Sequence, residues 1–246
     1  VFKTVLISKE QRDRGIKAGG PRKKSTIIPN PVKVLETKEK FDFKNQFVFG
    51  MHQRDDDNIF SPIPLEAYKK IESKNTIFIF LGGSKKYRNQ AELLGIKNIK
   101  FLPTTADIRV IHKFLNSLDV YAHGRKDGEQ CSTAIIEAMS HGLPFISHIA
   151  PSMGHVEQIN ESGLIAKDVD EYSKGMSKFI EDKNFYDTCS KKSKYRYDLI
   201  YSLDSVLEKY INVIDDVISA KSVSSFDILL NNFQNYFTSL ILKIKK

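Results

Sequence analysis

Short apolar segments recur along the middle of the chain and alternate with segments that have helical character. The predicted strands are three to six residues long and lie at Phe47–Gly50, Thr76–Leu81, Ile99–Leu102, Leu118–Tyr121, Leu143–Ser147 and Leu164–Ala166. Helices are predicted between them, and one opens at Ser61-Pro62 with a hydroxyl N-cap and a proline in its first turn. Continuously apolar strands that alternate with helices are typical of a parallel sheet covered on both faces. The sequence therefore predicts an α/β fold.

The loops that follow the predicted strands are the expected place for a ligand. The strand-to-helix loops are Met51–Ser61, Gly82–Gln90, Pro103–Asp107 and His123–Ser132. In an open parallel sheet, ligands bind outside the carboxyl ends of the strands, where the connection order reverses. We therefore expect all four loops to meet at one edge of the sheet and to form a site there.

The last of these loops leads into a segment with two carboxylates, Glu129 and Glu137, eight positions apart. An apolar run that begins near Ser132 predicts a helix that ends at His141-Gly142. The first N–H groups of such a helix lack intrahelical partners and, together with the helix dipole, form an anion site. At a rise of about 1.5 Å per residue, the carboxylates would be on the order of 12 Å apart. This arrangement suits an elongated ligand with a central phosphate, although two capping or surface glutamates would show the same spacing.

The net charge of +8 belongs to the ends of the chain. Residues 1 to 40 contain 11 basic and 4 acidic residues, the last six residues contain three lysines, and the remainder has a net charge of −2. A nucleic-acid-binding domain more often spreads its basic residues over a groove, with aromatic residues or a recognisable module. We therefore expect no nucleic acid partner, whereas an anionic membrane surface stays a candidate partner for the basic ends.

The sequence also predicts the compartment. No apolar run approaches the roughly 20 residues that span a bilayer, and the N-terminus has neither a leader with a cleavage site nor an initiator Met. We expect a processed, truncated or fragmentary chain. Cys131 and Cys189 have neither metal-ligand spacing nor the pattern of a disulfide framework. A reduced, cytoplasmic location follows, with peripheral contact to the cytoplasmic membrane face as the alternative.

The two ends of the chain differ from the middle. Near the N-terminus, short strands are predicted at Thr4–Ile7 and Thr26–Ile28, Pro29-Asn30-Pro31 fixes an extended turn, and residues 33–46 have the composition of a linker. After residue 168 helices are predicted at about Asp170–Glu181, Asn184–Ser190 and Leu203–Ala220. The last segment spaces Phe226, Leu230, Phe233, Phe237, Leu240, Ile241 and Ile244 as one apolar helical stripe. That stripe suits docking against another domain or lying on a membrane surface.

The segment from Glu129 to Ile146 resembles the nucleotide-sugar-binding domain of retaining glycosyltransferases of the GT-B fold, family 4 (glycosyl transferases group 1). The family pattern is a glutamate, seven residues, Glu-Ala-Met, and then a glycine, a proline and an apolar strand. It occurs here as Glu129, Glu137-Ala138-Met139 and Gly142-Leu143-Pro144-Phe145-Ile146. Further landmarks between about residues 25 and 180 match in order: Ile28–Val32, Phe47–Gly50, Phe78–Gly82, Leu118–Val120, Gly154–Glu157 and Gly163-Leu164.

The resemblance implies a doubly wound, Rossmann-like parallel sheet, the C-terminal half of a GT-B fold, with additional C-terminal helices. It implies a remnant of an acceptor-side domain plus linker at 1–45, the donor-binding domain at 46–190 and C-terminal helices at 191–246. In the family the first glutamate contacts the donor sugar, the second holds the ribose hydroxyls, and amides after the first bind the diphosphate. Carried over, these are Glu129, Glu137 and the backbone of Gln130, Cys131, Ser132 and Thr133, with the base against Pro103 and Thr104.

The chain departs from the family pattern around the diphosphate. The family's Gly-Phe-Gly is Gln130-Cys131-Ser132 here, so β-carbons narrow the approach of the phosphate, and the Ser132 hydroxyl is a substitute donor. The family's Arg and Lys after the first strand have one clear counterpart, the catalytic candidate Arg54, and Arg125 and Lys126 are candidates for the second charge. Solvated surface charge is the other interpretation of these cations. His123 either bonds the sugar or diphosphate or is a satisfied histidine at a strand end.

Two further chemistries are weighed at this site. Asp55-Asp56-Asp57 offers the oxygen ligands that hard cations prefer, but in this fold cations and amides neutralise the diphosphate, so we expect no metal and no cofactor. Cys131 lies at a predicted helix N-terminus, where a thiol pKa can be lowered. No base accompanies it in the sequence, which favours an inert neighbour of the phosphate.

These expectations combine into one function. The chain is predicted to carry the donor half of a retaining glycosyltransferase of hexosyltransferase type, active in glycan biosynthesis, that uses a nucleotide-diphosphate sugar. The acceptor, a glycan, lipid or protein, would be bound by a missing N-terminal domain or a second chain. A non-catalytic nucleotide-sugar or carbohydrate-binding module is the alternative from another class. A nucleotide-sugar epimerase of the same fold is a third, but it would need further acid/base groups.

Overall fold

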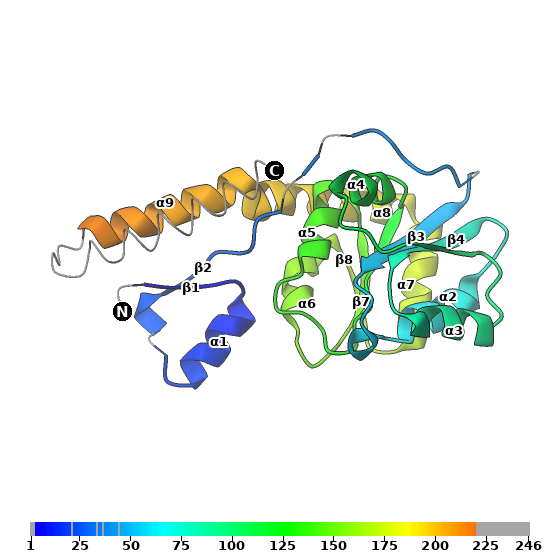
Figure 1. Ribbon diagram of the computed structural model, residues 1–246, viewed down its shortest axis with the longest axis horizontal. Coiled ribbons are helices and arrows are strands. Elements are labelled where there is room, and N and C mark those ends of the chain that lie inside the picture. Colours follow the sequence, from blue (N-terminus) through cyan, green and yellow to red (C-terminus); the bar gives the residue numbers. More distant parts are fainter. Residues whose placement is uncertain (1–2, 21, 33, 36, 44, 220–246) are drawn as a thin grey trace.

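A six-stranded parallel sheet forms the centre of the molecule in the computed structural model, which describes residues 3–219 except 21, 33, 36 and 44 (Figure 1). The strand order in the described part of the chain is β5-β4-β3-β6-β7-β8. The strands are β3 (Phe47–Gln53), β4 (Thr76–Gly82), β5 (Ile99–Leu102), β6 (Val120–Ala122), β7 (Phe145–His148) and β8 (Gly163–Ala166). All neighbouring pairs are parallel. The predicted α/β fold with a doubly wound parallel sheet is confirmed.

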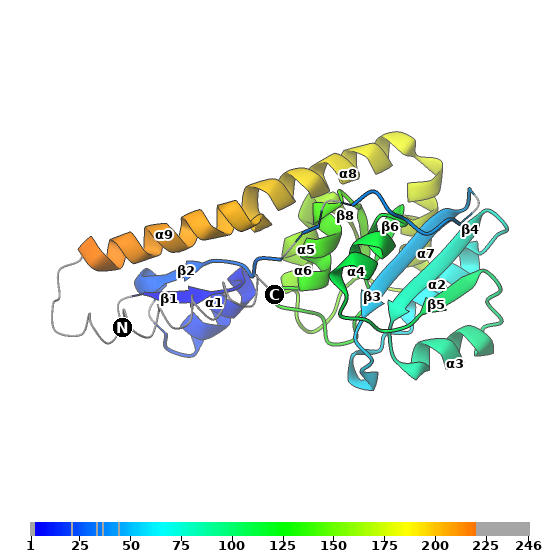
Figure 2. The ribbon, with the colours of Figure 1, turned by 45° about the horizontal axis from the view of Figure 1, so that its top comes forward.

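Helices connect the strands, and most of them cover the sheet (Figure 2). They are α1 (Lys9–Lys17), α2 (Ile63–Ile71), α3 (Lys85–Leu93), α4 (Ile108–Leu115), α5 (Thr133–Ser140), α6 (Gly154–Ile159), α7 (Val169–Glu181), α8 (Lys183–Arg196) and α9 (Leu203–Ser219). Because crossovers are right-handed, the helices after β3 and β4 and those after β6 and β7 lie on opposite faces. Accordingly, α2 packs against α7, while α5 packs against α4, α6 and α8. None of the described helices combines the length and apolar character needed to cross a membrane.

Several helix boundaries differ from the prediction. Helix α3 occupies most of the segment predicted as the loop Gly82–Gln90, because Ser84 caps it and only Tyr87 and Ala91 are buried. Two buried positions are too few for a visible apolar stripe. Helix α8 continues to Arg196 and ends in a π-helical turn, Tyr197–Tyr201, rather than stopping near Ser190. The short helix α6 was also not predicted. The predicted apolar stripe between residues 226 and 244 lies outside the described residues.

The N-terminal segment forms a small unit beside the sheet. Strands β1 (Thr4–Leu6) and β2 (Ser25–Ile27) pair in parallel, and α1 connects them. The segment predicted as a linker then runs along α4, where the Asn116 side chain donates to the carbonyls of Thr37 and Glu39. Helix α9 returns to the unit, since Lys3 Nζ lies 3.0 Å from an Asp216 carboxylate oxygen. Figure 2 shows α9 alongside β1 and β2.

The core explains why the strands are continuously apolar. In β4 every residue except Ile77 is buried, because helices cover both faces of the sheet. Large aromatic side chains fill the space: Tyr68, Tyr87, Phe78, Phe80 and Phe49 are fully buried. Burial of this kind stabilises the fold by about 25 cal/mol per Å² of apolar surface. The rigid sheet thus fixes where each strand ends, and so where the loops of its carboxyl edge begin.

Candidate functional site

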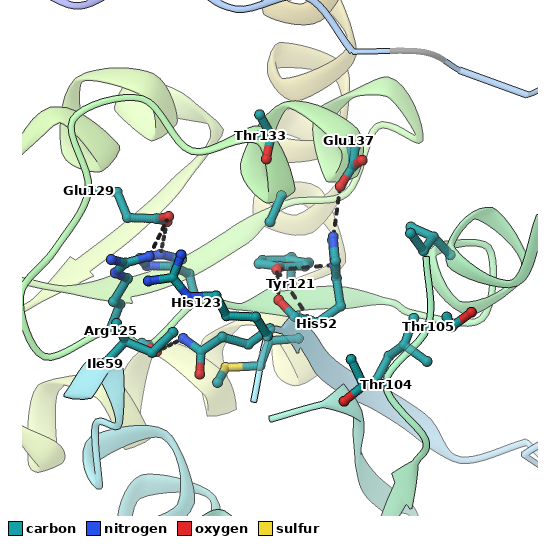
Figure 3. Close-up of a pocket in the computed structure, with 17 residues that line it drawn as sticks. His52, Ile59, Thr104, Thr105, Tyr121, His123, Arg125, Glu129, Thr133 and Glu137 are labelled. Carbon is teal, nitrogen blue, oxygen red and sulfur yellow. Dashed lines mark hydrogen bonds and ion pairs between the residues drawn. The ribbon is translucent and has the colours of Figure 1, made fainter. Parts of the chain in front are cut away.

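A cavity of about 310 Å³ opens at the carboxyl edge of the sheet (Figure 3). The loops after β3, β5 and β6 contribute to it as expected, whereas the β4 connection contributes only Leu81 from the strand itself. Seven of the predicted site residues line it: Glu129, Glu137, Arg54, Arg125, His123, Thr104 and Thr133. Residues not predicted for the site also line it: Met51, His52, Gln53, Ile59, Leu81, Thr105, Ile111, Tyr121, Gly124 and Ala134. The sheet edge therefore brings together most of the set that the sequence indicated.

Glu129 is held from both sides at one end of the cavity. One carboxylate oxygen lies 3.0 Å from His123 Nε2 and the other accepts a hydrogen bond from Arg125 Nη1 at 3.2 Å. Burial alone would raise the pKa of Glu129, but the hydrogen bond and charge of His123, the Ser132 hydroxyl and the charge of Arg125 lower it to about 2. An ionised carboxylate only accepts, so Nε2 of His123 carries a proton. Its Nδ1 lies 2.7 Å from the Ser147 hydroxyl, which fixes the ring.

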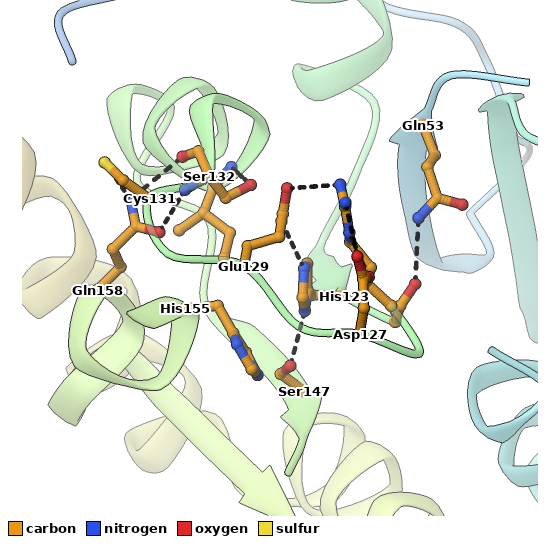
Figure 4. Close-up of polar contacts among 12 residues, drawn as sticks. Gln53, His123, Asp127, Glu129, Cys131, Ser132, Ser147, His155 and Gln158 are labelled. Carbon is orange, nitrogen blue, oxygen red and sulfur yellow. Dashed lines mark hydrogen bonds and ion pairs between the residues drawn. The ribbon is translucent and has the colours of Figure 1, made fainter. Parts of the chain in front are cut away.

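The loop between Arg125 and Glu129 is closed by an ion pair and a tight turn (Figure 4). Asp127 accepts two hydrogen bonds from the Arg125 guanidinium, at 2.6 and 3.0 Å, and its pKa is lowered by that contact. Gly128 has a φ of +69°, and a Cβ there would lie 1.9 Å from the Ser152 carbonyl oxygen. Only glycine suits such a turn. The Arg125 guanidinium is therefore bonded to two carboxylates while it lines the cavity.

Glu137 lies on α5 and faces His52 at the opposite end. The distance from His52 Nε2 to a Glu137 carboxylate oxygen is 2.8 Å. The rings of Phe114 and Tyr121 meet the His52 ring edge-on, with centroids 6.1 and 5.6 Å away. His52 was not predicted as a site residue, and β3, which runs three residues beyond its predicted end at Gly50, carries it. Its place directly after a predicted strand, in a loop expected at the ligand edge, was the available signal.

The first turn of α5 is partly engaged by the protein itself. Ser132 caps the helix through a bond from the Ile135 N–H, and its own N–H donates to Gln158 Oε1 at 2.7 Å. Neither Ser132, which is buried, nor Gln130 or Cys131 is part of the cavity wall. The N–H groups of Thr133 and Ala134 have no intrahelical acceptor, and these residues do line the cavity. Of the N–H groups expected to form an anion site at the start of this helix, only those of its first two residues are therefore available at the cavity.

Cys131 is a half-buried neighbour of this turn. The Gln158 amide donates to its sulfur at 3.7 Å (Figure 4). Burial raises the pKa of the thiol, and a hydrogen bond from the Asn30 backbone offsets part of that effect. The alternative of a thiol pKa lowered by the helix N-terminus is therefore wrong. Gln158, from the end of α6, was not predicted as a neighbour of this turn.

Arg54 lines the cavity, and the aspartate run follows it directly in the chain. Arg54 is 65% exposed and its guanidinium donates to Asp56 at 2.9 Å. Asp56 also caps the 3₁₀ turn Asp57–Ile59, so the acidic run begins a turn. No group of three or more His, Cys, Asp or Glu residues suited to a metal ion occurs in the described part of the chain. Of the pair expected against a base, Thr104 lines the cavity, together with Thr105, and Pro103 does not.

Fold and cavity together define a Rossmann-like α/β domain with two carboxylates flanking the first turns of a helix at its ligand edge. The sequence model described as "Glycosyl transferases group 1" matches residues 62–196, more than half of the chain, and the chain belongs to this family. The predicted family resemblance is confirmed at this level. A comparison with curated protein sequences gives no match.

Solved structures show the same fold at low sequence identity. HepE from Anabaena, in complex with UDP and glucose, has a TM-score of 0.72 and 19% identity, with 87% of this chain and 63% of that chain covered. A glycosyltransferase from Rickettsia africae gives a TM-score of 0.72 and 13% identity over 89% and 64% of the two chains. Sucrose-phosphate synthase from Thermosynechococcus elongatus gives 0.71 and 12% over 88% and 58%. This chain thus spans about three fifths of these proteins.

Proposed function

We propose that this chain forms the donor side of a retaining glycosyltransferase of family 4 that transfers a hexosyl group from a nucleoside-diphosphate sugar. The observation that carries the proposal is the placement of Glu129 and Glu137 in one cavity, on either side of the free N–H groups at the start of α5. Helix N-termini bind phosphate through such groups and the helix dipole. A donor has a sugar, a diphosphate and a ribose in a row, and this order matches the order of the groups along the cavity.

Each end of the donor has a partner in this assignment. Glu137, oriented by His52, accepts hydrogen bonds from the ribose hydroxyls, and the nucleobase lies toward Thr104 and Thr105. The Thr133 and Ala134 amides bind the diphosphate. Because Arg125 is bonded to Asp127 and Glu129, Arg54 is the cation more available to the leaving group. Its exposed side chain reaches the diphosphate after leaving Asp56.

The chemistry follows from charge development during transfer. As the bond between the anomeric carbon and the diphosphate lengthens, negative charge grows on the leaving oxygen and the sugar becomes oxocarbenium-like. The amides of α5 and Arg54 stabilise the first charge, and the ionised Glu129, placed against the sugar, stabilises the second. Preorganised groups of this kind lower the barrier because they need no reorganisation during the reaction. The amides and cations neutralise the diphosphate in this scheme without a metal.

In this proposal, the acceptor is bound by parts of the protein outside this chain. This chain covers about three fifths of related structures, and we propose that an N-terminal domain or a second chain binds the glycan, lipid or protein acceptor. We propose a cytoplasmic location, because the protein would use a nucleotide-sugar donor. Peripheral contact with the cytoplasmic face of the membrane is compatible with this location. UDP is the first nucleotide to test, because the HepE structure was determined with UDP.

A thermal-shift panel of UDP-, GDP- and ADP-sugars tests the donor site. One of them is expected to raise the melting temperature of the wild type but not that of Glu137→Ala. Glu161→Ala is the matched control, because Glu161 is an exposed glutamate that pairs with Lys192. If no nucleotide sugar stabilises the wild type, the donor-site proposal fails. If one stabilises wild type and Glu137→Ala alike, the ribose assignment fails.

Hydrolysis or transfer of a radiolabelled donor then separates an enzyme from a binding module. The full-length gene product is expected to release the sugar from the donor that the panel selects. Binding without any release of labelled sugar would instead favour the non-catalytic module. Retention is read from the anomeric configuration of the transferred sugar, and an inverted product would contradict the proposed mechanism.

A further inference from the structure

Helix α1 of the N-terminal unit contacts the loop after β7 through one carboxylate, that of Glu10. One oxygen of Glu10 accepts a hydrogen bond from the Ser152 hydroxyl at 2.9 Å and another from the Met153 N–H at 2.9 Å. The other oxygen pairs with Arg14, one turn along the helix. The side chain is only 19% exposed. Charge-assisted bonds to several partners hold a carboxylate more firmly than a single surface ion pair does.

The same loop, together with the first turn of α6 that follows it, is bonded to the backbone around Glu129. The Ser152 N–H donates to the Asp127 carbonyl at 3.0 Å, and the His155 N–H donates to the Glu129 carbonyl at 2.9 Å. Ser152 and Gly128 also form a parallel bridge. The loop that Glu10 holds is therefore the loop that fixes the segment from Asp127 to Glu129.

We propose that Glu10 is a positioning residue that holds the loop at residues 149–154 so that the Glu129 carboxylate is placed against the donor sugar. This inference rests on the proposed function. Glu10 is not part of the cavity wall, so it acts through Ser152 and Met153 rather than by touching the donor. The contact joins residues 142 positions apart and links the N-terminal unit to the sheet.

The position of this contact predicts a selective effect on the donor. His52 and Glu137 lie on β3 and α5, and Thr104 follows β5, so the nucleotide end rests on elements other than the 149–154 loop. Among the described residues, no hydrogen bond joins Glu10, Ser152 or Met153 to that end of the cavity. Loss of the Glu10 contact should therefore weaken binding of the sugar and spare binding of the nucleotide.

Calorimetric binding of UDP and of UDP-glucose, or of the pair with the base selected by the thermal-shift panel, tests the inference. Glu10→Ala is expected to weaken the nucleotide sugar roughly tenfold, because a displaced group loses its productive geometry, and to change UDP less than about twofold. Ser152→Ala, which leaves the Met153 N–H in place, should give a smaller loss of the same kind. Asp13→Ala is the matched control, since this α1 carboxylate pairs with Lys9 and is 49% exposed.

Two outcomes overturn the positioning role. If Glu10→Ala lowers the affinity for both ligands equally, the domain has loosened as a whole. If it changes neither affinity, the contact does not contribute to donor binding. If Glu10→Ala does not fold, Glu10→Gln takes its place. Its amide oxygen can still accept both bonds but carries no charge, so it should give an intermediate, still sugar-selective loss.

Amide hydrogen exchange tests the Glu10 contact without any ligand, and so independently of the proposed function. In the free protein, Glu10→Ala should accelerate exchange of the Ser152 and His155 amides, which bond the carbonyls of Asp127 and Glu129. Asp13→Ala should not accelerate it. If the wild type binds no nucleotide or nucleotide sugar, the donor-site proposal fails by itself. Unchanged exchange of these two amides overturns the coupling through Glu10 whatever the ligand result.

Discussion

Each end of the cavity has a glutamate carboxylate, and the two carboxylates are held in place by different kinds of contact. Glu129 lies on a loop, and ion pairs, two histidine contacts and a glycine turn fix it. Glu137 lies on a helix, and it meets a histidine whose ring contacts two aromatic rings edge-on. A loop-borne group depends on a network of polar contacts, whereas a helix-borne group depends on the core. The Glu129 end should therefore be sensitive to charge and backbone changes, and the Glu137 end to loss of packing.

The largest effect is expected at Glu129. Glu129→Gln removes the charge that we place against the developing oxocarbenium ion and keeps the shape of the side chain. Donor turnover should fall by roughly two orders of magnitude, while binding of UDP changes little. Steady-state turnover and calorimetry measure the two quantities. A variant with normal turnover would remove Glu129 from the reaction.

A pair of glycines tests the backbone difference between the ends. Gly128→Ala places a Cβ 1.9 Å from the Ser152 carbonyl oxygen at a φ of +69°, so the unfolding free energy should fall by about 3 kcal/mol. Gly142, at the end of α5, has a φ of +67° but only ordinary contacts, and Gly142→Ala should cost about 1 kcal/mol. Urea unfolding of both variants gives the values. Equal losses would show that the Glu129 loop is not more constrained than a helix end.

The packed end is tested by removing its histidine. His52→Ala leaves Glu137 without its partner and without a fixed orientation. Nucleotide affinity should fall roughly tenfold, equally for UDP and for the nucleotide sugar, because we propose that Glu137 binds the ribose that both ligands share. Calorimetry with both ligands measures this. Sugar-selective weakening would instead place His52 at the wrong end of the donor.

Acid should act on two buried histidines and on Glu129 in different pH windows. Burial lowers the pKa of His155, whose ring centroid lies 5.0 Å from that of His123, to about 4, and lowers the pKa of His141 also to about 4. The unfolded chain binds these protons near pH 6.5, so stability is full above that pH and is lost as pH falls from about 6.5 to 4. The low pKa of Glu129 adds stability above about pH 4.5 that is lost toward pH 2.

Unfolding curves across pH, recorded for wild type, His155→Gln and Glu129→Gln, separate these windows. The histidine variant should flatten the slope between pH 6.5 and 4, and the glutamate variant the slope below pH 4.5. Identical slopes in all three proteins would mean that neither group differs in pKa between the folded and unfolded states.

The smallest effect is expected at Arg54, which is exposed and bonded to Asp56. Arg54→Ala should change the unfolding free energy by less than about 0.5 kcal/mol, since surface ion pairs contribute little. Affinity for the diphosphate should fall a few fold at low salt and less at high salt, because screening weakens the charge. Binding titrations at two ionic strengths test this. A salt-independent loss would indicate a direct structural role.

Much of this arrangement could be predicted from local patterns. The apolar strand runs gave the parallel sheet, and the positions of their ends gave the loops with Glu129, His123 and Arg125. The helix of Glu137 followed from its apolar run and the glycine at its end. These features depend on neighbouring residues and on periodicity, which one sequence displays.

The missing features depend on distant residues or on weak patterns. His52 meets Glu137 across 85 positions, and Gln158 meets Ser132 across 26, so neither pairing has a sequence spacing to reveal it. Gln158 takes up the Ser132 amide that the local pattern had left for a phosphate. Helix α3 buries too few residues for its period to show. Hydrogen bonds between polar groups that are distant in the chain thus leave no local sequence pattern from which they could be predicted.

The central strand β3 also sets an order of events for the newly made chain. On one edge it pairs with β4, which is near in sequence: Phe47 lies opposite Thr76. On the other edge it pairs with β6, which is more distant: Phe49 lies opposite Val120. Contacts of such separation form late, because loop closure costs entropy before they stabilise anything. Until residue 122 has been synthesised, β3 has an open, apolar edge of the kind that promotes association between chains. Truncations before that point should therefore aggregate, while longer pieces close the edge within their own sheet.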